Sequence, residues 1–113
     1  MALQTEILER EVKGSNMITR IFRVQIKPEL REEFEALYRV KSIDAVQKAK
    51  GFVSVTIGKP TVWAPDEYVM ISTWSSEAAL KGFAGKKWNE AHIPPGMEKF
   101  IVDCWLHHYQ SFD

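Results

Sequence analysis

Residues 74–92 read WSSEAALKGFAGKKWNEAH, and the rest of the chain is organised around them because here an apolar strand passes into a helix. The two serines that follow Trp74 are good helix N-caps. Glu77 falls in the first turn, where the positive end of the helix dipole favours an acid. Leu80 and Phe83 then recur at helical spacing. The pattern predicts a helix that starts at the serines.

Glycines interrupt this helix before the stretch ends. Gly82 and Gly85 both weaken helical structure, so we expect a break near Gly85. A second short helical piece is then expected to carry Trp88 and His92, which lie four residues apart and would share one face. Pro94 and the proline after it end this piece. In the simpler alternative, this face belongs to the core and the histidine bonds to a backbone carbonyl.

The composition indicates a single small domain that binds no nucleic acid. The chain has 113 residues, with 15 basic and 15 acidic side chains and no cluster of Lys and Arg interleaved with aromatics. Cys104 is the only cysteine, which excludes an intrachain disulfide and fits a reducing compartment. No apolar run has the length of a signal peptide or a membrane span. We therefore expect a cytoplasmic protein with no nucleic-acid or membrane partner.

Apolar patterning divides the rest of the chain into strands and one long helix. We treat residues 1–16 as an N-terminal extension and residues 17–113 as the domain. Between the first two strands, apolar side chains at helical spacing follow Pro28 and continue to Gly51, which predicts a long amphipathic helix. Alternating or β-branched apolar runs predict strands at residues 18–26, 52–57, 67–74 and 100–109.

The resulting order is β-α-β-β-α-β, which is the ferredoxin-like arrangement of the α+β class. Both helices then cover one face of an antiparallel sheet, and the other face stays bare. A second copy of the chain would cover that face, so that two sheets form a dimeric α+β barrel. We therefore predict an isologous homodimer.

Several motifs make the chain from residue 18 onward resemble the antibiotic biosynthesis monooxygenase (ABM) superfamily, and within it the bacterial haem-degrading monooxygenases. The motifs are Gly51-Phe52 after the first helix, Trp74-Ser75-Ser76-Glu77-Ala78-Ala79 at the start of the second, Glu90-Ala91-His92, and His108-Tyr109 on the last strand. The resemblance implies a ferredoxin-like fold and an oxidative enzyme.

In the haem-degrading members, the histidine of the Ala-His motif ligates the iron, and an upstream tryptophan and a first-strand asparagine shape the distal side. The resemblance therefore implies that His92 is the metal ligand. Phe83 stands where the tryptophan would be and Phe22 stands near the asparagine position, and neither ring can donate a hydrogen bond. Trp88 is the residue that could replace the missing bulk. Phe22, Phe83 and Trp88 are thus the candidate catalytic residues.

A bound haem would need further contacts. Arg23, with Lys86 and Lys87, is a cation that could meet the haem propionates. With His92 and Trp74, Arg23 makes up the candidate cofactor-binding set. Because phenylalanines replace the two family residues, haem would be held without being degraded, or degraded differently.

Two other functions stay open. The other ABM branch contains cofactor-free oxygenases that oxidise aromatic polyketides, and these need an apolar slot and a group that orients or deprotonates a phenol. In such an enzyme Trp74, Trp88 and Phe22 would form the slot, with His92 or Tyr38 as the polar group. The third possibility is a non-catalytic dimer that binds a ligand on the same fold, in which the histidine is structural.

Overall fold

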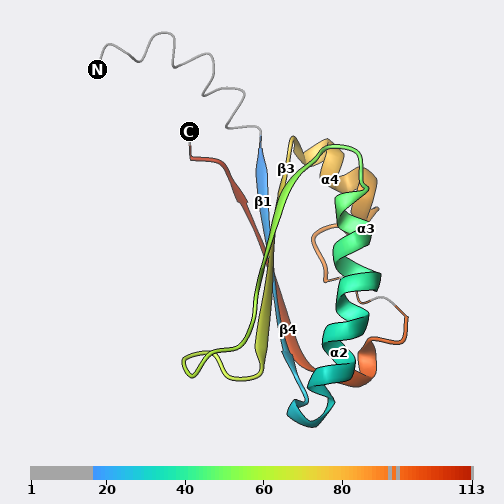
Figure 1. Cartoon of the computed structure of the whole chain (residues 1–113). Helices are drawn as coiled ribbons and strands as arrows, with labels where there is room; N and C mark the ends of the chain where they lie inside the picture. Colours follow the sequence, from blue (N-terminus) through green and yellow to red (C-terminus); the bar gives the residue numbers. More distant parts are fainter. Residues whose placement is uncertain (1–16, 92, 94, 113) are drawn as a thin grey trace.

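One four-stranded antiparallel sheet forms the centre of the fold, with the helices packed on one of its faces (Figure 1). The computed structural model describes residues 17–91, 93 and 95–112. The strands are β1 (Ile18–Ile26), β2 (Phe52–Gly58), β3 (Glu67–Trp74) and β4 (Ile101–Gln110), in the spatial order β2-β3-β1-β4. Every bound lies within one residue of the predicted strand. The predicted ferredoxin-like α+β fold is confirmed.

The first helical segment is one continuous rod that changes its pitch in the middle. It consists of η1 (Pro28–Leu30), α2 (Arg31–Tyr38), η2 (Arg39–Ile43) and α3 (Asp44–Gln47). The η2 turn is a π-helix, which the sequence pattern did not predict. The buried side chains explain it, because Tyr38 and Ile43 both face the core and lie five residues apart.

The second helix begins as predicted and ends earlier. Helix α4 spans Glu77–Ala84, and the Ser76 hydroxyl caps it by accepting a hydrogen bond from the Ala79 N–H at 3.1 Å. Gly85 ends it with φ of 86°. The predicted second helical piece is wrong in the described residues, because 86–89 form a hydrogen-bonded turn in which the Trp88 N–H reaches the Gly85 carbonyl at 3.1 Å. A 3-10 turn, η3 (Glu98–Phe100), then leads into β4.

The core lies between the helices and the sheet. The strands meet it through alternate residues, and Val24, Ile26, Tyr68 and Trp74 are almost completely buried. Phe34 on α2 fills the centre of the core. The centroid of its ring lies 4.8 Å from that of Tyr38 on the same helix, 4.9 Å from that of Tyr68 on β3 and 5.7 Å from that of Phe100 in η3.

The opposite face of the sheet carries none of the described helices (Figure 1). Ile21 and Ile71 are paired across β1 and β3 on this face and are only half-buried. Arg23 lies here as well, where its Nε donates to the Glu67 carboxylate at 2.7 Å and its guanidinium lies 4.8 Å from the centre of the Trp105 ring. The bare face is therefore a mixture of apolar, aromatic and paired charged groups.

Residues 1–16, which the sequence marked as an extension, lie outside the described residues. Among the described helices, none has the length and apolar character that crossing a bilayer requires.

Candidate functional site

A cavity of about 300 Å³ lies between the sheet and the helices. We call it the Phe22–Phe83 cavity, after the two aromatic side chains that line it from β1 and α4. Its volume falls at the lower end of small-molecule sites, which span about 300–1,000 Å³. The lining residues are Arg20, Phe22, Lys41, Ser42, Ala45, Val46, Met70, Phe83 and Ala84.

The sheet supplies the floor of the cavity through the helix-facing residues of β1 and β3. Phe22 and Met70 are paired across these strands, and Phe22 packs against the core. Arg20 lies two residues before Phe22 and so projects from the same face. It is the one charged residue among the alternating positions of β1 that face the helices, the others being Ile18, Phe22, Val24 and Ile26.

The π turn supplies a second wall. Lys41 and Ser42 both belong to η2 and both line the cavity. Single π turns inside α-helices occur frequently at functional sites, because the extra residue changes which side chains face inward. The Lys41 Nζ also donates to the Pro95 carbonyl at 2.9 Å, which ties the π turn to the loop before β4.

Phe83 supplies the third wall of the cavity. Its ring lies 5.0 Å from that of Trp74, and 41% of the residue's surface is exposed. Trp74 itself is fully buried, and its indole N–H donates to the Ser72 hydroxyl at 3.0 Å. Trp74 therefore supports Phe83 from behind and does not line the cavity.

Arg20 gives the cavity a positive group. Its Nη1 donates to the backbone carbonyl of Trp88 at 3.3 Å. Burial lowers the pKa of its guanidinium, which nevertheless stays protonated at neutral pH. Within the described part of the chain, no carboxylate lies within ion-pair distance of this guanidinium.

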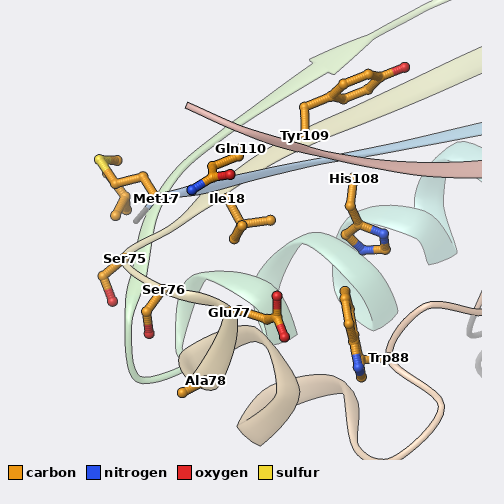
Figure 2. A pocket seen from close by; sticks show the side chains of 11 residues that line it. Met17, Ile18, Ser75, Ser76, Glu77, Ala78, Trp88, His108, Tyr109 and Gln110 are labelled. Carbon is orange, nitrogen blue, oxygen red and sulfur yellow. The ribbon is translucent and has the colours of Figure 1, made fainter. Parts of the chain in front are cut away.

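A second, more open cavity of about 940 Å³ lies at the end of the sheet, next to the start of α4 (Figure 2). Figure 2 shows Trp88 and His108 facing each other there, with ring centroids 4.9 Å apart at an interplanar angle of 68°. Burial, and then the nearby charge of Arg20, lowers the pKa of His108, while Glu77 opposes this effect. The imidazole is therefore neutral at pH 7.

The structure brings together two of the residues that the sequence singled out. Phe22 and Phe83 line the same cavity, whereas Trp88 lines the other one. Arg23 lies on the bare face of the sheet, away from both phenylalanines. His92, the predicted iron ligand, lies outside the described residues.

Tyr38, the other polar group proposed from the sequence, lies beside the cavity. Together with Phe22 and Ser42 it lines a neighbouring pocket of about 30 Å³. Its hydroxyl is buried and meets no hydrogen-bond partner among the described residues. Burial raises the pKa of this phenol far above its ordinary value of 10.0, so the hydroxyl stays neutral at physiological pH.

The described lining of the Phe22–Phe83 cavity does not fit haem. The Phe22–Phe83 cavity is small for a porphyrin, and its described lining contains no histidine, cysteine or tyrosine, three common ligands of haem iron. No group of three or more His, Cys, Asp or Glu side chains suited to a metal ion occurs in the described ranges. The site offers an apolar slot with two cations, Arg20 and Lys41.

Of the nine lining residues, the sequence singled out Phe22 and Phe83 as site residues and missed the other seven, among them Arg20, Lys41 and Ser42. Two signals point to these three. Arg20 interrupts the apolar side of an alternating strand, which is unusual for a charged residue. The five-residue step between the buried Tyr38 and Ile43 indicates an extra residue in the helix, and Lys41 and Ser42 line the cavity from this π turn.

Known structures share this fold. A conserved protein from Methanosarcina mazei Go1 has a TM-score of 0.70 at 19% identity, covering 89% of this chain and 98% of its own. A protein from Caulobacter crescentus CB15 has a TM-score of 0.71 at 14% identity, with coverages of 94% and 99%. A mutant of SnoaB, a cofactor-independent oxygenase from Streptomyces nogalater, has a TM-score of 0.67 at 15% identity, with coverages of 87% and 95%.

At these identities the likeness to solved structures is one of fold. A comparison with curated proteins gave no match. The family model named antibiotic biosynthesis monooxygenase, in contrast, matches residues 17–92, which include β1, the first helical segment, the β2–β3 hairpin and α4. The match therefore covers all the elements that form the Phe22–Phe83 cavity, and the chain belongs to the antibiotic biosynthesis monooxygenase family.

Proposed function

We propose that the chain is an oxygenase that oxidises a small aromatic substrate in the Phe22–Phe83 cavity without haem. The observation that carries this proposal is an apolar slot between two phenylalanine rings, one from the sheet and one from α4. Offset or edge contacts with such rings bind a planar aromatic molecule. Ser42 and the two cations supply the few polar groups that orient a ligand in an otherwise apolar site.

The reaction we propose uses the electrons of the substrate itself. A phenol with a free para carbon reacts with O2 to give the para-quinone and water. One oxygen atom forms the new carbonyl, and the other leaves as water with the para hydrogen and the phenol proton. The ring loses four electrons and O2 gains four. The protein's part is to exclude water, hold the ring and stabilise negative charge on the phenol oxygen.

Two findings support this reading over haem chemistry. SnoaB, which has the same fold, is a cofactor-independent oxygenase. The described lining of the cavity is small and lacks the usual haem ligands. In this chain Phe22 and Phe83 would therefore hold a substrate ring in place of a porphyrin.

The test is turnover of α-naphthol under air by haem-free, chelator-treated protein, with the quinone followed by its absorbance. We expect oxidation above the uncatalysed rate, and we expect Phe83→Ala or Phe22→Ala to lower kcat/KM by about tenfold or more, or about 1.4 kcal/mol of binding to the transition state. Phe112→Ala is the matched control, because Phe112 is 98% exposed and lines none of the described cavities.

The same assay separates this proposal from the haem hypothesis. If the haem-free protein is inactive, and saturable hemin binding followed by decay of the Soret band with ascorbate occurs instead, the proposal is wrong and His92→Ala becomes the next variant. If hemin does not bind and α-naphthol is not oxidised above background, the oxygenase proposal fails, and a non-catalytic ligand-binding module is favoured.

We also propose that the chain acts as a homodimer closed through the bare face of the sheet. Ile21, Val69, Ile71 and Trp105 are apolar side chains on this face and are only half-buried in the single chain. A second copy would remove them from water, which stabilises association by about 25 cal/mol for each Å² of apolar surface buried.

A further inference from the structure

Arg20 is a cation at an apolar site without a counter-charge in the described structure. Burial lowers the pKa of its guanidinium, whose one hydrogen bond within the described residues is to the carbonyl of Trp88, at 3.3 Å. A carbonyl dipole only partly compensates a buried positive charge, which costs free energy unless an anion lies nearby. Such a residue in a cavity, rather than in the packed core, points to a ligand.

Lys41 places a second cation on the same cavity. It comes from the π turn, opposite the sheet that carries Arg20, and within the described residues its Nζ makes one hydrogen bond, to the carbonyl of Pro95. The ion pairs found in the described residues do not include Lys41. Two cations on different elements therefore share one cavity whose described lining contains no acid.

None of the lining residues that the neighbouring elements contribute is acidic. Strand β3 lines the cavity with Met70, and helix α4 lines it with Phe83 and Ala84. Glu77 of α4 lines the other cavity, where its charge opposes the lowering of the pKa of His108. His108, which faces Arg20 across β1 and β4, is held neutral because burial and Arg20 lower its pKa. The field inside the cavity is thus positive, and the low dielectric of its apolar walls strengthens it.

We propose that the ligand of the Phe22–Phe83 cavity is an aromatic oxyanion, either a phenolate or an aryl carboxylate, whose charged oxygen meets Arg20 and Lys41 while its ring lies against the phenylalanines. This inference deepens the proposed function and rests on it for the identity of the cavity as the substrate site. A phenolate is more electron-rich than the phenol, so the same cations that bind it prepare its ring for reaction with O2. The described lining then needs no separate general base.

The experiment compares α-naphthoate with α-naphthamide by isothermal titration calorimetry, because the two share a ring system and differ in charge. We expect the intact protein to bind the naphthoate about tenfold more tightly or better, a difference of about 1.4 kcal/mol. In Arg20→Gln this preference should be largely lost, with naphthamide binding unchanged. Arg20→Lys, which keeps the charge, should restore part of it.

Lys41→Gln should lower the preference by a smaller factor, because Lys41 is more exposed than Arg20. Lys48→Gln is the matched control, since it removes one exposed cation that lies in the turn directly after this helical segment and does not line the cavity. Unchanged naphthamide binding shows in each variant that the cavity still folds.

Binding of α-naphthol distinguishes the two sources of the anion. If the site takes phenolates, the pKa of bound α-naphthol falls below its value in water, and phenolate absorbance appears near neutral pH. If α-naphthoate is preferred and the pKa of bound α-naphthol is unchanged, the ligand is an aryl carboxylate.

Equal affinity of the intact protein for naphthoate and naphthamide would overturn the oxyanion proposal. If α-naphthol were still oxidised in that case, the oxygenase function would stand with a neutral substrate. Failure of both ring compounds to bind would overturn both proposals, because the cavity would then hold no aromatic ligand. A naphthoate preference that survives in the Arg20→Gln, Lys41→Gln double variant would also overturn the assignment to these two cations.

Discussion

The hydroxyl of Tyr38 is a buried polar atom without a described hydrogen-bond partner. A variant that lacks this hydroxyl therefore tests whether it contributes to the stability of the fold. Removing an unpartnered buried hydroxyl costs nothing in hydrogen bonding. We therefore expect Tyr38→Phe to leave the free energy of unfolding unchanged or to raise it by up to about 1 kcal/mol. Urea denaturation measures this directly. A loss of stability in Tyr38→Phe would show that the hydroxyl has a partner in solution.

Tyr68 is the matched control, because its ring packs against the same Phe34 and its hydroxyl donates to the Glu35 carboxylate. We expect Tyr68→Phe to lower the free energy of unfolding by about 1 to 2 kcal/mol at pH 7, since this hydrogen bond to a charged acceptor is lost. If both tyrosine variants behave alike, the contrast between a partnered and an unpartnered hydroxyl is wrong.

The effect of Tyr68→Phe should also depend on pH. The hydrogen bond from Tyr68 is the main cause that lowers the pKa of Glu35 from 4.5, so its contribution is lost as the pH falls below 4.5 through the lowered value. Burial, and then Glu35, raises the pKa of Tyr68 from 10.0 to about 12, so the contribution is also lost as the pH rises from 10.0 toward 12. The difference between the variant and the intact protein is therefore largest between these limits.

The sequence indicated the apolar side chains of the site better than the polar ones. Phe22 and Phe83 were singled out because the family resemblance places them at site positions, and both line the cavity. Arg20 interrupts the apolar side of β1, but this alone does not assign it to a site, and Lys41 gave no signal because a charged side chain on a helix surface is ordinary. Only the three-dimensional pairing of β1 with the π turn shows that these cations share a site.

Helix α4 is held against the rest of the fold at a glycine. Gly51 has φ of +85°, and a Cβ on it would lie 2.3 Å from the Cβ of Ala79. Gly51→Ala should therefore be strongly destabilising, by about 2 to 4 kcal/mol, because it combines backbone strain with a clash between α4 and the turn before β2. Thermal and urea denaturation of the variant give the value.

Variants of two other glycines separate the cost of backbone strain from the cost of the steric clash. Gly85 has φ of +86° and open space where a Cβ would be, so Gly85→Ala should cost only about 1 kcal/mol. Gly82 lies inside α4 with open space and an ordinary φ, so Gly82→Ala should stabilise the protein by about 0.5–1 kcal/mol. If Gly51→Ala costs no more than Gly85→Ala, α4 does not pack on this turn as described.

At the level of elements, the periodicity of apolar residues was sufficient to predict the strands but not to predict local changes in helix pitch. The sheet bounds, the N-cap at Ser76 and the break at Gly85 followed from side-chain patterns and turn chemistry. The π turn and the loss of helix after Gly85 did not follow from these patterns, because packing against the rest of the fold decides both. Trp88 turns toward His108 on the sheet, and no helical face is needed to bury it.

The bare face of the sheet makes a prediction for the whole molecule. We expect size-exclusion chromatography with light scattering to give the mass of a homodimer at micromolar concentration. Ile71→Glu should shift the protein to the monomer by raising the dissociation constant about 100-fold or more, a cost of about 2.7 kcal/mol, because the charge would be buried at the interface.

Val40→Glu is the control for this variant, since Val40 is 64% exposed on the helical side of the molecule and should leave the dimer intact. A monomer in the unchanged protein would rule out the barrel. A dimer that tolerates Ile71→Glu would place the interface on another surface.

The π turn absorbs one extra residue in the first helical segment while both halves of the segment keep a face on the core. Each residue of an α-helix advances the chain by about 100° around its axis, so residues four apart share a face and residues five apart do not. Deleting one residue from Arg39–Ile43 would place Tyr38 and Ile43 four residues apart, and both would still face the core of a regular α-helix. The deletion would instead shorten the wall from which Lys41 and Ser42 line the cavity. The extra residue is thus dispensable for the core and is needed for the cavity.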